Sequence, residues 1–193
     1  VADIMIGLAL YGALVTTTGA GAAVSTERAS GWSRQLRLTP LKPVCYILAK
    51  AVVGLLFAMV AVAGVYVLGP LRHAQMPAGA WIASALIVWA GSLVFVAFGL
   101  FIGYVLSSDS ATQIIGGLMA LLAFLGGMFT PLTPGSAMDR IGSFSPMYGL
   151  HKLALQPLGA EPFSWWWVVN VVAWLAVFLG GAAWRMGYDT ARV

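Results

Sequence analysis

The chain has 193 residues, of which 61% are hydrophobic and only 8% are charged, and its mean hydropathy is +0.92. These values exclude a water-soluble fold. Its formal charge of +4 would suit nucleic acid in a soluble protein, but basic residues spread over connecting loops are better explained by membrane topology, so we expect no nucleic-acid partner. Because the apolar runs far exceed the roughly 10 residues of a barrel strand, we predict an all-α, polytopic membrane bundle forming one domain over residues 1–193.

Five apolar stretches are long enough to cross a bilayer as helices, which takes about 20 residues. The second begins after Pro43, a residue suited to the first turn of a helix, and the fifth opens with three tryptophans typical of the headgroup region. Four polar residues separate the third from the fourth, which predicts a tight hairpin with Asp109 capping a helix that starts at Thr112. The predicted spans cover residues 4–24, 44–68, 81–106, 112–129 and 165–188.

The distribution of lysine and arginine predicts the orientation of these spans. More of them lie in the loop of residues 27–42 and near the C-terminus than in the loops of the opposite side, so we expect that loop and the C-terminus to be cytoplasmic in the cell membrane. The chain would then start outside. It opens with Val1 and without a basic leader, and we therefore expect one further span upstream, which would give six spans in the complete protein.

The segment from Ser25 to Pro40 is the most polar part of the chain. Placed on a helix, its apolar residues, among them Trp32 and Leu36, gather on one side and its charged residues on the other. The pattern alone favours an interfacial helix with its apolar face in the headgroups and its arginines near anionic lipid. A helix that docks on a protein partner is the alternative.

Four motifs resemble the permease subunits of type-2 ATP-binding-cassette (ABC) exporters, including bacterial multidrug and antibiotic exporters. One is Glu-Arg-x-x-Gly followed by basic and leucine residues and then proline, over residues 27–40. The others are a glycine-rich third span over 91–113, Gly-Gly-Met-Phe-Thr-Pro-Leu over 126–132, and a Pro-x-Tyr segment over 143–155. The resemblance covers nearly the whole chain, except that the first span of the family is absent.

The resemblance implies that residues 27–38 form a coupling helix that docks into a groove on a separate ATPase subunit, so that the apolar face meets protein rather than lipid. It also implies a dimer with a second permease, either identical or different. This chain has no Gly-x-x-x-x-Gly-Lys-Ser/Thr phosphate loop, so ATP and Mg²⁺ belong to the partner and the chain itself is not an enzyme. The expected docking residues are Glu27, Arg28, Gly31, Trp32, Arg34, Leu36 and Arg37.

Two further contacts are expected near this segment. Glu27 and Lys50 lie near the same ends of consecutive spans, where they either form a salt bridge or extend independently to the interface. Gly99 and Gly103 form a small-xxx-small motif, which allows close helix packing within the chain and, as an alternative, a dimer interface or a substrate path.

Residues 130–162 hold several prolines among apolar residues, which predicts short external helices that re-enter the outer leaflet and cap a translocation path. Asp139, Arg140, His151 and Lys152 suggest, as a much weaker alternative, the catalytic cluster of a membrane hydrolase or transferase. No spacing of His, Cys and Glu suits a metal ion, and Cys45 is the only cysteine.

With the family resemblance, the predicted function is export of a hydrophobic or amphipathic substrate such as a drug, an antibiotic or a lipid. The alternative is a membrane protein that does not depend on ATP, either a secondary transporter or a lipid-modifying enzyme. Both usually require ionisable residues within the membrane, and the central thirds of the predicted spans have none. The expected path residues are Tyr11, Thr16, Thr17, Met119, Phe124, Met128 and Phe129.

Overall fold

The computed structural model describes residues 1–31, 43–72, 74–129, 132, 135–159 and 161–191. In this part of the chain the regular structure is helical throughout, and five helical segments are long and apolar enough to cross a membrane. They are Ala2–Ala29, Cys45–Leu68, Ala78–Val105, Ser108–Leu125 and Trp165–Met186. The predictions of an all-α membrane bundle and of five spans are confirmed.

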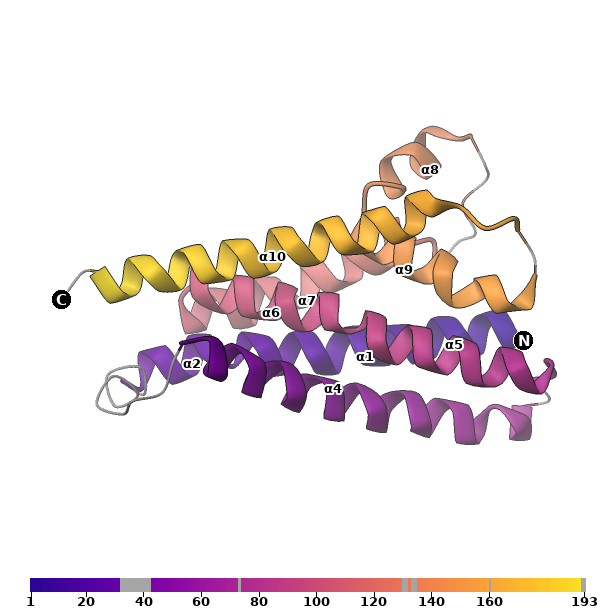
Figure 1. Cartoon of the computed structure of the whole chain (residues 1–193), viewed down its shortest axis with the longest axis horizontal. Coiled ribbons are helices and arrows are strands. Elements are labelled where there is room, and N and C mark those ends of the chain that lie inside the picture. The colour runs from indigo at the N-terminus through magenta and orange to yellow at the C-terminus, as the bar shows by residue number, and fades with distance from the viewer. Residues whose placement is uncertain (32–42, 73, 130–131, 133–134, 160, 192–193) are drawn as a thin grey trace.

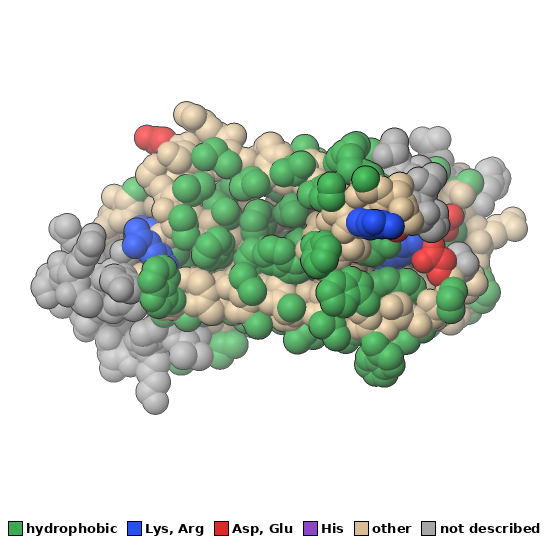
Figure 2. Space-filling model, turned by 90° about the horizontal axis from the view of Figure 1, so that it is seen from above, with side chains coloured by type: hydrophobic (Ala, Val, Ile, Leu, Met, Phe, Trp, Pro, Cys, Tyr) green, Lys and Arg blue, Asp and Glu red, His purple; other side chains and the backbone are tan. Residues whose placement is uncertain are grey.

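The long helices run side by side along the longest axis of the molecule (Figure 1). The α2 end, as we name it, holds α2 and the C-terminal part of α10, and the α9 end holds the N-terminus, α8 and α9. Figure 2 shows hydrophobic side chains across the middle of one face, with charged side chains toward its two ends. This is the pattern expected of a bundle whose middle lies in lipid. The elements are α1 Ala2–Ala22, α2 Val24–Ala29, α4 Pro43–Leu68, η1 Pro70–Arg72, α5 Ala78–Gly91, α6 Leu93–Val105, α7 Ser108–Leu125, α8 Ala137–Gly142, α9 Pro146–Leu155, η2 Gln156–Leu158 and α10 Trp165–Ala191.

Helix α1 lies at the centre of the bundle, against α4 on one side and α6 on the other. Its contact with α6 is very close, because a Cβ atom placed on Gly99 would lie 2.3 Å from the carbonyl oxygen of Thr18. Gly21 and Gly103 meet the facing backbone in the same way. Glycines on both helices therefore let the two backbones touch, and within this chain the small-xxx-small motif serves helix packing.

Helix α4 is held to the third span by two side-chain hydrogen bonds. The Tyr66 hydroxyl donates to the Ser84 hydroxyl at 2.8 Å, and the Trp89 indole N–H donates to the Leu55 carbonyl at 2.9 Å. The opposite side of α4 is open, with Leu56 and Val60 more than half exposed. Exposed apolar side chains of this kind are covered in a membrane by lipid or by the apolar surface of another protein.

Two predicted spans differ from the structure at particular residues. The third is divided at Ser92 into α5 and α6, since the Ser92 hydroxyl bonds to the Trp89 carbonyl at 2.6 Å and competes with the backbone ladder. The fourth starts at Ser108 rather than Thr112, and Ser107, not Asp109, is its N-cap. A serine hydroxyl one residue before the helix reaches the free N–H groups of the first turn, which is why it takes this position.

The segment between α7 and α10 folds back onto the bundle. Gly127, with φ of 71°, ends α7 in a Schellman motif, in which Met128 N–H bonds to the Ala123 carbonyl at 3.1 Å. Helix α8 follows on the outside, and α9 packs against α10 and α5. The side chain of Leu150 covers Gly91 of α5, and Met147 and Leu150 are almost fully buried. Helix α9 is thus part of the core.

Candidate functional site

The predicted coupling helix begins inside a helix of the structure but does not continue as one unbroken helix. Glu27 and Arg28 lie in α2, which ends at Ala29, and Gly31 adopts a left-handed conformation with φ of 78°. Since α2 extends the first span, these residues stand at the end of a candidate membrane segment that runs to Ala29 rather than to residue 24. The predicted end of the first span is therefore corrected from residue 24 to Ala29. The expected helix of residues 27–38 is interrupted at Gly31, because a left-handed glycine ends a helix. Trp32, Arg34, Leu36 and Arg37 lie outside the described residues.

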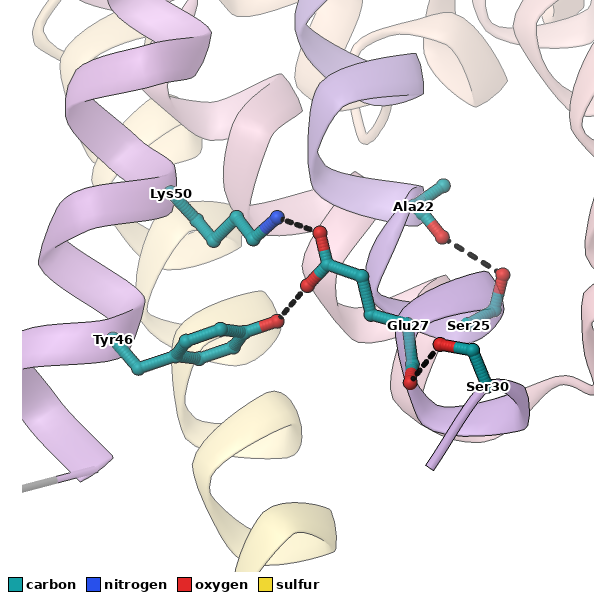
Figure 3. Close-up of polar contacts among 6 residues, drawn as sticks. All are labelled: Ala22, Ser25, Glu27, Ser30, Tyr46 and Lys50. Carbon is teal, nitrogen blue, oxygen red and sulfur yellow. Dashed lines mark hydrogen bonds and ion pairs between the residues drawn. The ribbon is translucent and has the colours of Figure 1, made fainter. Parts of the chain in front are cut away.

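The carboxylate of Glu27 has two partners on α4 (Figure 3). Lys50 Nζ forms an ion pair with Glu27 Oε1, and the Tyr46 hydroxyl donates a hydrogen bond to Glu27 Oε2. The Lys50 ammonium also lies 5.6 Å from the centre of the Tyr46 ring. Both oxygens of Glu27 are therefore used, and its two contacts join α2 to α4, whereas the Lys50–Tyr46 contact lies within α4.

Tyr46 is a partner that sequence reasoning missed. It lies four residues before Lys50, so both side chains project from the same face of α4 toward Glu27. That spacing was a usable signal. A tyrosine and a lysine one helical turn apart, facing an acidic residue across a loop, can bind the two oxygens of one carboxylate.

The Arg28 side chain turns to a different neighbour. Its Nη1 donates to the Gly103 and Tyr104 carbonyls at 3.2 and 2.9 Å, and its guanidinium carbon lies 5.5 Å from the centre of the Tyr104 ring. These two carbonyls belong to the last turn of α6, where no helical N–H follows to bond them. Arg28 therefore caps α6 and places a positive charge at the negative end of its dipole.

The residues predicted for a substrate path do not all share one surface. Tyr11 and Phe129 are in edge contact with ring centroids 6.3 Å apart, and Met128 lies against Gly7 of α1. Phe124 and Phe129 are exposed, at 38% and 62%. Together with Thr16, which is partly exposed, these residues are accessible from outside this chain.

Two of the predicted path residues are covered. Thr17 is fully buried and Met119 is 9% exposed. The hydroxyls of Thr16 and Thr17 bond to carbonyls of their own helix, at 2.8 Å to Gly12 and 2.6 Å to Ala13. Neither hydroxyl is thus an unused polar group, and the accessible part of the candidate path is mainly aromatic and aliphatic.

The polar residues of the α9 end form a chain of pairwise contacts, in which Lys152 also lies 5.8 Å from the centre of the Tyr148 ring. The Tyr148 hydroxyl donates to Asp139 Oδ1 at 3.1 Å, and Lys152 forms an ion pair with Glu161. Burial, with the Asp139 hydrogen bond second, raises the pKa of Tyr148 to about 12. Within the described residues, no three His, Cys, Asp or Glu side chains are arranged to hold a metal ion. The idea of a catalytic cluster gains no support from this arrangement.

His151 closes the end of α7. Its Nδ1 lies 2.8 Å from the carbonyl oxygen of Gly126, the C-cap residue of α7, so the neutral ring with a proton on Nδ1 donates this hydrogen bond. Burial lowers the pKa of the imidazole, against the opposing effect of the bond to Gly126. The histidine thus serves as a partly buried hydrogen-bond donor between α9 and α7.

Three side chains of α10 bind the turn between α8 and α9, and sequence reasoning missed all three. Asn170 Nδ2 donates to the Ser143 carbonyl at 2.9 Å, and the Trp174 indole N–H donates to the Phe144 carbonyl at 2.6 Å. Trp166 reaches Ser143 more weakly, at 3.3 Å. Residues 166, 170 and 174 are spaced by four and share one helix face, which was the only available signal.

These features define the class of the protein as an α-helical, multi-pass membrane protein, with polar contacts between helices at both ends and an apolar middle. The ABC-2 family transporter protein family matches residues 1–185, and the chain belongs to this family. It is 26% identical over 161 residues to the putative transport permease YvfS of Bacillus subtilis (strain 168), an alignment that covers 82% of this chain and 66% of that protein, slightly less than two thirds of its length. No solved structure matches the chain.

Proposed function

We propose that the chain is the membrane permease of an ATP-driven exporter. The observation that carries the proposal is the family match over residues 1–185, on a bundle whose first span ends in Glu27 and Arg28 bound to two other spans. The relative from Bacillus subtilis is named a putative transport permease, in agreement with this function. The ATPase is a separate subunit, which binds ATP and Mg²⁺.

The ATPase docks on the segment that follows α2. Residues 27–38 carry charged side chains beside Trp32 and Leu36, a composition suited to an apolar groove with a polar rim. The α2 end, with Arg28, Lys50 and Arg185 on its helices, faces the cytoplasm. The α9 end then faces outward, with α8 and α9 at the exit of the path.

The substrate is hydrophobic or amphipathic. The accessible candidates on α1, α7 and the turn after α7 offer mainly apolar surface, namely Tyr11, Thr16, Phe124, Met128 and Phe129. Such a surface suits a drug, an antibiotic or a lipid, as in multidrug export. One chain presents only one wall, so a second permease, of the same or a different sequence, completes the path.

The proposal is tested by purifying the tagged chain from its native membrane and identifying an ATPase that travels with it. Trp32→Asp and Leu36→Asp are expected to release that subunit while the membrane fold remains. Ser30→Ala, at an exposed position of the same segment that is not one of the expected docking residues, is the matched control and should retain it. If no ATPase accompanies the wild-type chain, the proposed function is wrong. Retention of the partner by both Trp32→Asp and Leu36→Asp would exclude docking through these two residues.

A further inference from the structure

We propose that Glu27 and Arg28 are two separate links by which one turn of α2 holds two different spans, with Glu27 holding α4 and Arg28 holding α6. The proposal rests on the proposed function only for the cause of movement, an ATPase acting on the segment after α2. The links themselves are properties of this chain. Both are positioning residues, since they act through the helices they hold.

Helix geometry separates the two links. Consecutive residues on an α-helix project about 100° apart, so Glu27 and Arg28 point in different directions from α2. Glu27 meets Lys50 and Tyr46 on α4, whereas Arg28 meets Gly103 and Tyr104 on α6. One short helix is therefore joined to two spans through different polar partners, and the Tyr46 ring also packs against the buried cluster that contains Tyr104.

The link through Arg28 extends beyond α6. The hydroxyl of Tyr104, whose ring lies beside the Arg28 guanidinium, donates to the Met186 sulfur of α10 at 3.3 Å. Tyr104 also belongs to a small buried cluster with Val24 of α2 and Ala182 of α10. A displacement of Arg28 would thus act on the ends of both α6 and α10.

The two links differ in chemistry. Glu27 binds side chains, which can change rotamer, and Lys50 and Glu27 keep 18% and 31% of their side-chain surface exposed. Arg28 binds backbone carbonyls, which move only when α6 itself moves. The Arg28 link is accordingly the stiffer of the two, and α6 should follow α2 more closely than α4 does.

Spin labels on pairs of introduced cysteines test this division, in a Cys45→Ser background that removes the one native cysteine. Each pair shares a label at the exposed Ser30, with the second label on Val105 of α6 or on Leu48 of α4, which are 43% and 59% exposed. The width of the interspin distance distribution, measured by EPR on the purified chain in lipid nanodiscs, reports how firmly α2 holds each span.

Arg28→Gln is expected to broaden the distribution of the α6 pair about twofold and to leave the α4 pair unchanged. Glu27→Gln is expected to do the reverse. Arg28→Lys keeps the charge but not the planar fork, so it should give an intermediate width at α6, and it serves as the milder variant if Arg28→Gln does not fold. Equal broadening of both pairs by either variant, or no broadening of the α6 pair by both Arg28 variants, would overturn the proposal.

A second arm of the experiment separates this inference from the proposed function. Added ATP and the co-purified ATPase should leave the Ser30–Val105 distance nearly unchanged in the wild type, where α6 moves together with α2, and should shift this distance in Arg28→Gln. If no ATPase binds the wild-type chain, the proposed function fails, while the distance widths without partner still decide whether the two links exist. An α6 shift of the same size in Arg28→Gln as in the wild type would show that Arg28 does not transmit the movement.

Discussion

The two ends of the bundle are held together by different kinds of polar contact. At the α2 end, charged side chains join helices, with Glu27 bound to α4 and Arg28 bound to α6. At the α9 end, the turn between α8 and α9 is held to α10 by the neutral N–H groups of Asn170 and Trp174, which donate to backbone carbonyls. Backbone carbonyls accept hydrogen bonds at both ends, from the charged Arg28 at the first and from neutral side chains of α10 at the second.

This difference indicates where the bundle can adapt. Side-chain ion pairs that are partly exposed can separate and form again at small cost, because water and headgroups replace the lost partner. Backbone carbonyls in an apolar setting have no such replacement, and breaking their bonds leaves them unsatisfied. We therefore expect the Glu27–Lys50 contact at the α2 end to tolerate rearrangement and the turn that α10 binds at the α9 end to behave as a rigid unit.

The largest effect is expected from Gly149→Ala at the α9 end. A Cβ atom on Gly149 would lie 2.6 Å from Asn170 Oδ1 and 2.9 Å from the Trp167 carbonyl, so α9 and α10 would have to move apart. We expect a loss of about 1–3 kcal/mol in the free energy of unfolding, measured by melting in detergent. Gly180→Ala, with nothing within 4 Å, is the control and should not destabilise the protein. Equal melting of the two variants would show that the α9 end is not tightly packed.

Asn170→Ala is expected to have the next largest effect. It removes the 2.9 Å hydrogen bond to the Ser143 carbonyl and leaves only the weaker bond from Trp166. A loss of about 1 kcal/mol in the free energy of unfolding should follow. The neighbouring Val169→Ala, at a side chain that is 52% exposed, should change the stability by less than about 0.5 kcal/mol. If the two variants melt together, the hydrogen bonds from α10 do not hold the turn.

Charge reversal at Glu27 and Lys50 should cost less in stability and should depend on salt. Glu27→Lys and Lys50→Glu each place like charges side by side, whereas the double variant restores an ion pair with its sign reversed. We expect each single variant to lose up to about 1 kcal/mol and the double variant to recover most of it. The differences should shrink in about 1 M salt, where the Debye length is about 3 Å. A double variant that is no better than the singles would exclude the pairing.

The smallest effect is a pH dependence that comes from His151. Burial lowers the pKa of its imidazole, with Lys152 acting in the same direction and Asp3 and the Gly126 carbonyl opposing it. A pKa that is lower in the folded than in the unfolded state gives stability that is complete above about pH 6.5 and is lost as the pH falls toward the folded pKa. His151→Asn, which keeps a donor and does not titrate, should flatten the melting temperature between about pH 7.5 and 5.5. An unchanged slope would assign the pH dependence to other groups.

The fold was predictable to the extent that it depends on hydropathy. Five runs of apolar residues predicted the number of helices that could span a membrane, while the first of these helices runs to Ala29 rather than to residue 24. Ser92 divides the third span and Ser107 sets the start of the fourth, because a hydroxyl can bond to its own backbone. A sequence offers many serines, and only the folded chain shows which ones bond in this way.

The candidate site was predictable only in part. The pairing of Glu27 with Lys50 could be predicted from the sequence because both residues lie near the same loop, and the structure brings them together. Arg28 and the α6 carbonyls could not be paired, since the carbonyls carry no sequence signal and lie 75 and 76 residues away. Thr17 seemed suitable for a path, but the rotation of α1 turns it inward, and it is fully buried.

The sequence by itself determined that this chain is a bundle of membrane helices and that its polar chemistry lies at the helix ends, because both follow from the local cost of placing polar groups in lipid. The tertiary structure alone decided which helix faces meet, which glycines touch facing backbone and which side chains bind the carbonyls of another helix. These outcomes depend on the rotation and tilt of each helix against its neighbours. The rotation and tilt of each helix are set by the packing of the whole bundle, so the sequence of a single helix does not determine them.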